Sequence, residues 1–149
     1  MKRLLIIFLL IMAGCNAGKQ SEEEPAGTYM TDSAGKPYTV VQKGKIFQVY
    51  GYVTCHICNE AEPKADIEID PSPGLRHNTG LVQWNGFLKA TRTYNKDWRF
   101  TELEYTAIET GEWQLKNRIS FNIGDQSYEI EGAPLTVCVE DEEYRCASS

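Results

Sequence analysis

The alternation of apolar and polar residues constrains the fold of this chain more than any other feature. From Tyr38 onward apolar side chains recur at every second residue, and almost no window shows the 3.6-residue period of a helix. Eight or nine short segments of this kind, separated by turn residues, predict an all-β domain, either an antiparallel β-sandwich or a small barrel. The predicted strands include residues 46–54, 65–69, 87–94, 99–108, 112–115 and 133–139.

The segment from Arg118 to Glu131 has the best-determined predicted structure. A two-residue turn at Gly124-Asp125 suits a hairpin, because glycine adopts a positive φ without strain. One face then collects nearly all the apolar side chains of both strands, and such cross-strand pairs stabilise the register. The register pairs Ile123 with Gln126, Phe121 with Tyr128, and Ile119 with Ile130.

The first 14 residues have the layout of a secretory signal peptide. Two basic residues precede nine uninterrupted apolar residues, a run shorter than the ~20 that a membrane-spanning helix needs. The ending Met12-Ala13-Gly14-Cys15 resembles the bacterial lipobox, which implies cleavage before Cys15, a diacylglycerol on its thiol and an acylated N-terminus. Asn16, rather than Asp, directly follows the cysteine, which resembles the pattern that sorts lipoproteins to the outer membrane. An ordinary secretory signal with an incidental cysteine is the alternative.

Three regions follow from this interpretation. Residues 1–14 form the signal peptide, residues 15–37 a lipidated N-terminus and flexible tether, and residues 38–149 a single β domain. Removal of residues 1–14 takes away two positive charges and no acidic residue, so the net charge falls from −6 to −8. An acidic exterior argues against a nucleic-acid partner, and membrane association depends on the lipid at Cys15.

Four cysteines remain beyond the lipidation site: Cys55, Cys58, Cys138 and Cys146. An even number in an exported chain predicts two disulfides, for which three connectivities exist. Extended residues i and i+3 lie about 10 Å apart, whereas a disulfide needs Cα atoms within about 7 Å, so local pairing requires a turn at His56-Ile57. Pairing of Cys138 with Cys146 would hold the acidic tail against the last strand. The crossed pairings remain alternatives.

A sensor of redox state or metal is the alternative function of the cysteines. Cys55-His56-Ile57-Cys58 has the spacing of disulfide oxidoreductases, in which a histidine lowers the pKa of a thiol. The same residues with His77, or the four cysteines together, offer zinc or copper ligands. However, redox cysteines of that class begin a helix in a βαβ unit, and no βαβ pattern occurs here. An oxidising envelope also favours disulfides over free thiolates.

Two segments resemble known families. Residues 48–55 followed by 65–69 look like the first hairpin of transthyretin-like, carboxypeptidase-regulatory domains, which implies a non-catalytic sandwich of about seven strands. Residues 51–58 and 111–115 are similar to a family of outer-membrane lipoproteins that report copper, adhesion and envelope stress, which implies a small barrel and a sensing role for the CxxC motif. That family carries proline where this chain has Thr54, and a helix that this chain lacks.

The sequence offers little for catalysis or for a cofactor. It contains no Gly-x-Ser-x-Gly, His-Glu-x-x-His or phosphate-binding glycine loop. Its three tryptophans and eight tyrosines suit either a strand core or a platform for sugar or peptide; Trp84, before Asn85-Gly86, is predicted to lie in an exposed turn and Trp113 in the core. We therefore expect a non-catalytic envelope lipoprotein that binds an envelope protein or has a structural role.

Overall fold

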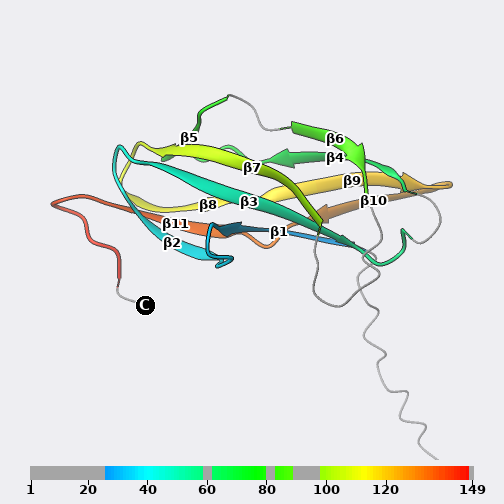
Figure 1. Cartoon of the computed structure of the whole chain (residues 1–149), viewed down its shortest axis with the longest axis horizontal. Helices are drawn as coiled ribbons and strands as arrows, with labels where there is room; N and C mark the ends of the chain where they lie inside the picture. The colour runs from blue at the N-terminus through cyan, green and yellow to red at the C-terminus, as the bar shows by residue number, and fades with distance from the viewer. Residues whose placement is uncertain (1–25, 59–61, 80–82, 89–97, 148–149) are drawn as a thin grey trace, which may run out of the picture.

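Strands make up all the regular structure in the described part of the chain. The computed structural model describes residues 26–58, 62–79, 83–88 and 98–147, and Figure 1 shows their arrangement. The predicted signal peptide and Cys15 lie outside these ranges. The all-β prediction is confirmed. The strands are β1 (Ala26–Asp32), β2 (Tyr38–Gln42), β3 (Ile46–Cys55), β4 (Lys64–Ile69), β5 (Leu75–His77), β6 (Gln83–Phe87), β7 (Trp98–Ala107), β8 (Gly111–Leu115), β9 (Asn117–Ile123), β10 (Gln126–Glu131) and β11 (Leu135–Glu140).

Three sheets form the two layers of a sandwich (Figure 1). Sheet A has the strand order β1-β3-β7-β5 and makes one layer; sheet B (β2-β11-β8) and sheet C (β10-β9-β4-β6) make the other. Only Lys116 separates β8 from β9, so the chain passes directly from sheet B into sheet C. The pairs are antiparallel except that β2 runs parallel to β11. These two strands are far apart in sequence, so no hairpin forces them to be antiparallel.

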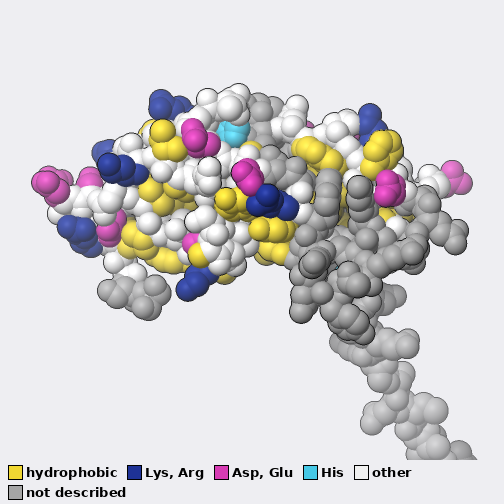
Figure 2. Space-filling model, viewed as in Figure 1, with side chains coloured by type: hydrophobic (Ala, Val, Ile, Leu, Met, Phe, Trp, Pro, Cys, Tyr) yellow, Lys and Arg dark blue, Asp and Glu magenta, His cyan; other side chains and the backbone are white. Residues whose placement is uncertain are grey.

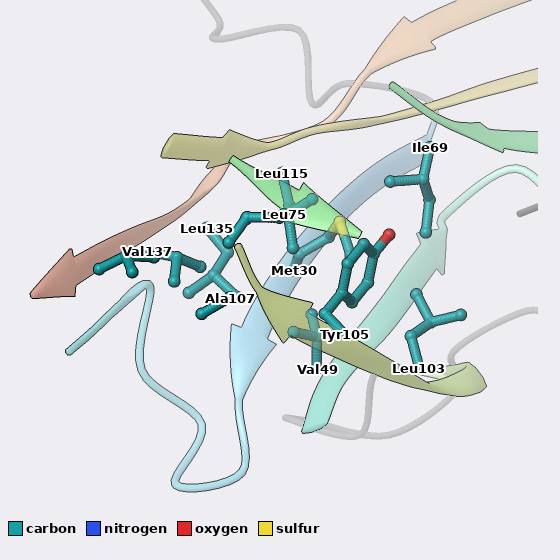
Figure 3. Packing of buried hydrophobic residues seen from close by; sticks show 11 residues of the cluster. Met30, Val49, Ile69, Leu75, Leu103, Tyr105, Ala107, Leu115, Leu135 and Val137 are labelled. Atoms are coloured by element: carbon teal, nitrogen blue, oxygen red, sulfur yellow. The ribbon is translucent and has the colours of Figure 1, made fainter. Parts of the chain in front are cut away.

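The first hydrophobic cluster lies between the layers where sheet B faces sheet A. Figure 3 shows Met30 of β1 and Tyr105 of β7 among the aliphatic side chains of the facing strands. Full burial of one such aliphatic side chain stabilises the fold by about 1.5–3 kcal/mol. The buried members are Met30, Val49, Ile69, Leu75, Leu103, Tyr105, Ala107, Leu115, Leu135, Val137 and Val139, with Trp113 packed against them as predicted.

The second hydrophobic cluster lies where sheet C faces sheet A, and it contains the CxxC motif. Phe121 and Tyr128, predicted to face each other, stack with ring centroids 5.0 Å apart. The whole predicted register of this hairpin is confirmed, and Gly124 has the expected positive φ of 57°. The buried members are Ala26, Val53, Cys55, Cys58, Ala65, Ile67, Leu88, Ile119 and Phe121.

The prediction of a turn at Trp84-Asn85-Gly86 is wrong. These residues lie inside β6, and the half-buried Trp84 packs against the second cluster. A side chain at Gly86 would have its Cβ 2.1 Å from the Trp84 ring, so glycine is needed there to let the ring lie across the strand. The Asn-Gly signal therefore reflects close packing rather than a turn. Strand β6 ends at Phe87, and residues 89–97 of the predicted strand 87–94 lie outside the described residues.

The predicted tether boundary at residue 37 is also wrong, because β1 belongs to the domain. This strand pairs with β3 from Ala26 to Asp32. The buried Thr28 accepts a 2.6 Å hydrogen bond from Asn117 Nδ2, and its carbonyl accepts one from the Ala133 amide. Strand β1 turns only one large apolar side chain, Met30, into the core. Its hydropathy pattern is therefore too weak to be recognised as a strand.

Candidate functional site

The CxxC motif forms a disulfide at the end of β3. The chain turns at His56 and Ile57, which brings the Cα atoms of Cys55 and Cys58 to 5.6 Å. The two cysteines are 1% and 2% exposed within the second hydrophobic cluster, whereas His56 is exposed. Thiol–disulfide exchange needs a thiolate to reach a disulfide sulfur, and this burial opposes it. The geometry therefore favours a stapled turn over a redox centre.

The residues of the alternative metal site are not brought together. His77 lies in β5 of sheet A, where its ring contacts Tyr105 edge-on with centroids 5.0 Å apart and its Nδ1 lies 3.1 Å from Thr79 Oγ1. The pairing of Cys55 with Cys58 and of Cys138 with Cys146 also divides the four sulfurs between two places. Within the described ranges, no three His, Cys, Asp or Glu side chains are grouped closely enough to hold a metal ion.

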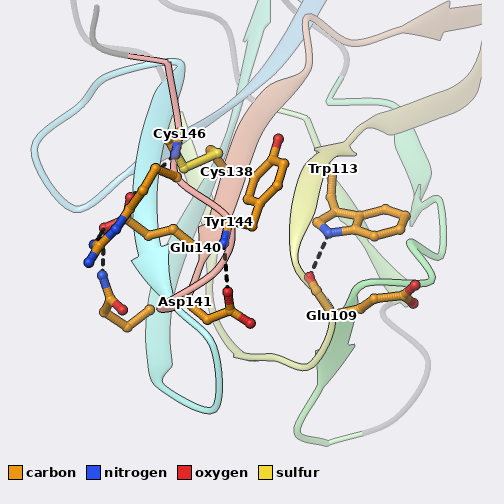
Figure 4. The surroundings of a disulfide bond; sticks show 9 residues. Glu109, Trp113, Cys138, Glu140, Asp141, Tyr144 and Cys146 are labelled. Carbon is orange, nitrogen blue, oxygen red and sulfur yellow. Dashed lines mark hydrogen bonds and ion pairs between the residues drawn. A yellow bond between two sulfur atoms is a disulfide. The ribbon is translucent and has the colours of Figure 1, made fainter.

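The second disulfide fixes the C-terminal residues 141–147, which we call the strap, on the outer face of sheet B. Cys138 points away from the core in β11 but is fully buried, because Cys146 and the strap cover it (Figure 4). The Glu140 carboxylate accepts hydrogen bonds from Gln42 at 2.5 Å and from Arg145 and the Cys146 amide at 3.4 Å. The acidic tail is thus held against the last strand, as the local pairing predicts.

Hydrogen bonds inside the strap explain one shifted pKa. The Asp141 carboxylate accepts hydrogen bonds from the backbone amides of Tyr144 and Glu143, both at 2.9 Å, and these lower the pKa of Asp141. The hydrogen bond from Lys116 likewise lowers the pKa of Glu131. Both carboxyl groups are exposed, and their partners fix local structure. These shifts indicate structural roles rather than catalytic ones.

Aromatic side chains gather on the outer face of sheet A. We call Tyr29, Tyr50, Tyr52 and Arg99 the tyrosine face. Tyr29 and Tyr52 are directly opposite in register and stack with centroids 5.0 Å apart and an interplanar angle of 13°. Figure 2 shows hydrophobic side chains among acidic and basic ones over β3 and β7. Strand β3 therefore presents valines to the core and tyrosines to the outside.

Charged and polar groups border and orient the tyrosine face. The Arg99 guanidinium lies 5.1 Å from the centroid of the Tyr50 ring, within cation–π range, and 2.8 Å from the Glu102 carboxylate. The Tyr50 hydroxyl donates to Gln48 Oε1 at 3.2 Å. The Arg99 and Glu102 side chains are about half exposed, 49% and 50%. This surface offers amphipathic rings with restricted orientations and a mixed-charge border.

Sequence reasoning missed the tyrosine face for two reasons. Tyr29 lies in the segment predicted to be a tether, and Tyr50 and Tyr52 lie in the predicted strand 46–54, for which the sequence alone predicts no binding face. The signal was present in β3, because Val49, Gly51 and Val53 define the inner face and so place the two tyrosines on the outer one. Register with β1 was needed to add Tyr29.

Comparison with known proteins supports the fold. No protein-family model and no curated protein sequence matches the chain. A cohesin module from a family 33 glycoside hydrolase of Clostridium perfringens ATCC13124 is similar in structure, with a TM-score of 0.51, 13% identity, and coverage of 78% of this chain and 98% of the module. A conjugative transposon lipoprotein from Bacteroides eggerthii DSM 20697 gives a TM-score of 0.39 and 17% identity over 73% and 95% of the two chains. No helix in the described ranges is long and apolar enough to span a membrane. At 13% identity, the likeness to the cohesin module shows a shared β-sandwich fold alone.

Proposed function

We propose that this chain is a lipid-anchored envelope protein whose β-sandwich binds a partner protein without catalysis. The tyrosine face is the observation that carries this proposal. Tyrosine and arginine are enriched among the residues that dominate binding energy at protein interfaces. Four such residues lie together here on the outer face of one sheet, where the fold itself needs only polar side chains.

The geometry of the tyrosine face suits a protein partner. Stacking of Tyr29 on Tyr52 restricts both rings before binding, which lowers the entropy lost when a partner immobilises them. Their hydroxyl groups supply hydrogen bonds at the end of an apolar body. The Arg99–Glu102 ion pair supplies both signs of charge at the border, which selects partners by electrostatic complementarity. The similarity of the fold to a cohesin module is compatible with a binding role.

The chemistry of the described residues supports a non-catalytic role. Tyr105 is the buried group with a strongly shifted pKa, raised to about 12 by burial, and its ring is part of the first hydrophobic cluster. A tyrosine that stays protonated at neutral pH inside a core is a packing residue. The two histidines lie apart from each other: His56 is in an exposed turn, and the His77 ring contacts Tyr105.

Anchoring at Cys15 rests on the lipobox-like sequence. Ten residues separate Cys15 from the first residue of β1, and at about 3.3 Å each they reach at most about 33 Å. The anchor would therefore keep the tyrosine face within about one domain width of the membrane. Cys15→Ala should release the protein from membranes or leave it unprocessed. Unchanged fractionation and palmitate labelling of that variant would disprove lipidation.

Site-specific photo-crosslinking in the native bacterium tests the binding face. We would replace Tyr50, on sheet A, or Ser120, on the outer face of sheet C, by p-benzoylphenylalanine and irradiate intact cells. The expected result is a discrete cross-linked product from position 50 that is lost when Tyr52→Ala is added. Equal products from both positions, or a product from position 50 that survives Tyr52→Ala, would contradict a specific role of the tyrosine face.

A further inference from the structure

The outer face of sheet C carries rows of polar side chains that cross all four strands. In one row Glu129 of β10 faces Ser120 of β9, Ser120 faces Asp66 of β4, and Asp66 faces Asn85 of β6. Apart from Phe87 of β6, the strands of this sheet turn their large apolar residues inward, so the outward positions can carry ligand-binding groups. The rows place hydroxyl, amide and carboxylate groups from four separate segments on one surface.

Three residues of this row, Asp66, Ser120 and Glu129, line a depression of about 430 Å³. The short side chains Ser120 and Asn122 come from the middle strand β9, and the longer Lys64 and Glu129 come from the strands on either side. The depression therefore forms where short side chains lie between longer ones. We call this site the polar depression, and its polar lining is Lys64, Asp66, Ser120, Asn122, Ser127 and Glu129.

Two hydrogen bonds orient the groups in and beside the depression. Ser127 Oγ donates to Asn122 Oδ1 at 2.6 Å, which fixes the plane of the Asn122 carboxamide. Asn85 Nδ2 donates to Asp66 Oδ1 at 2.7 Å, which fixes the Asp66 carboxylate. An ionised carboxylate accepts about four hydrogen bonds, so Asp66 keeps capacity for a ligand. Planar groups held in this way are well suited to pairs of neighbouring hydroxyls.

An exposed aromatic ring borders the same surface. Phe87 is directly opposite Lys64 in the β4–β6 register and is 57% exposed. Its neighbour Trp84 turns inward to the core, so Phe87 is not required for packing. A ligand that covers both Phe87 and the polar depression therefore needs an apolar face and several hydrogen-bonding groups.

We infer that the polar depression and Phe87 form a binding site for an uncharged oligosaccharide. A pyranose ring has an apolar C–H face that stacks on an aromatic ring and hydroxyl groups that pair with amides and carboxylates. Charge argues against an anionic ligand, because the depression holds one cationic side chain, Lys64, against two carboxylates, Asp66 and Glu129, and the whole chain is acidic. The site lies on the layer opposite the tyrosine face, so the two can act independently.

Calorimetric titration of the lipidated full-length protein in a sugar-free detergent tests this site. The probes are cellotetraose, mannotetraose and tetraacetylchitotetraose. We expect saturable binding of at least one with a Kd of about 1 mM or tighter, the range of a weak single-site contact. Phe87→Ala and Asn122→Ala should each weaken that binding at least about tenfold. Both side chains are exposed, so thermal unfolding should show that the variants stay folded.

Tyr50→Ala is the matched control, since it alters the tyrosine face and should leave the sugar Kd unchanged. No saturation by any of the three probes up to about 10 mM would overturn the inference, as would binding that Phe87→Ala does not weaken. Either failure would leave the photo-crosslinking result from position 50 intact, so this inference and the proposed partner binding fail separately.

Discussion

Sheets A and C are both four-stranded and antiparallel, but their outer faces carry different side-chain chemistry. In both sheets the inward positions supply the aliphatic residues of the core. The outer face of sheet A carries stacked tyrosines and an arginine, whereas that of sheet C carries short polar side chains in cross-strand rows. The fold requires neither arrangement, so the chemistry of each face points to what that face contacts.

Sheet B shows a third arrangement, in which the chain covers part of its own outer face, around Cys138. The strap lies over β11 and is held by the Cys138–Cys146 disulfide and by hydrogen bonds to Glu140. The covered part of this face is unavailable to a partner. The proposed binding surfaces are the outer faces of sheets A and C, and separate roles for inner and outer positions can be tested.

The largest expected effect comes from emptying an inner position of sheet A. Leu103 is 5% exposed in the first hydrophobic cluster, so Leu103→Ala should reduce the free energy of unfolding by about 3 kcal/mol in urea denaturation. Gln48→Ala, on the outer face, should change it by less than about 0.5 kcal/mol. An equal loss in both variants would show that the outer face of sheet A stabilises the fold as much as the core does. That result would contradict separate roles for inner and outer positions.

Alkaline pH should reveal the buried tyrosine of β7 through a loss of stability. Tyr105 has a folded pKa of about 12 and an unfolded pKa of about 10. Between these values the unfolded state has lost its proton while the folded state keeps it, so stability falls as pH rises from 10 to 12, by about 2.7 kcal/mol in total. Urea titrations at pH 8, 10, 11 and 12 measure this loss. Tyr105→Phe should lack it, and an unchanged pH dependence in that variant would refute the assignment.

Removal of the second disulfide should destabilise the domain and leave both binding faces unchanged. The Cys138→Ser/Cys146→Ser variant opens a loop of about nine residues, which should lower the free energy of unfolding by about 2.5 kcal/mol. Photo-crosslinking from position 50 and sugar binding should persist. Loss of either one at a temperature where the variant is folded would mean that the strap contributes to that face.

The smallest expected effect belongs to His56. This side chain is exposed at the tip of the stapled turn, so His56→Ala should change stability by less than about 0.5 kcal/mol. The rate of thiol alkylation should also stay unchanged, because the adjacent sulfurs are buried in a disulfide. A reactive, pH-dependent Cys55 that loses its reactivity in this variant would restore the redox interpretation.

Local pattern determines how much of this molecule could be predicted from its sequence. The hairpin register from Arg118 to Glu131 was predictable, because one face is apolar and the turn residues define the pairing. The β1 strand was not, since its buried threonine is satisfied by Asn117, a partner 89 residues away. The tyrosine face was unpredictable for the same reason, because Tyr29 lies opposite Tyr52 only through the pairing of β1 with β3.

The polar depression was hidden from the sequence for a related reason. The alternation of residues 65–69 places Asp66 and Glu68 on the polar face of a strand, but nothing local shows that Ser120 and Glu129 lie in the same row as Asp66. The misjudged turn at Trp84-Asn85-Gly86 also concealed β6 and with it the position of Phe87. Cross-strand neighbours, which the sequence does not contain, decide which polar residues share a surface.

The most direct test of the tyrosine face is the affinity of the purified, lipidated protein for the partner captured by photo-crosslinking from position 50. Tyr52→Ala should weaken this binding by at least about 30-fold, the loss of about 2 kcal/mol typical of a dominant interface residue. Asn122→Ala, in the polar depression, should leave the Kd within about twofold. The reverse order, with Asn122→Ala causing the large loss and Tyr52→Ala causing none, would contradict binding through the tyrosine face.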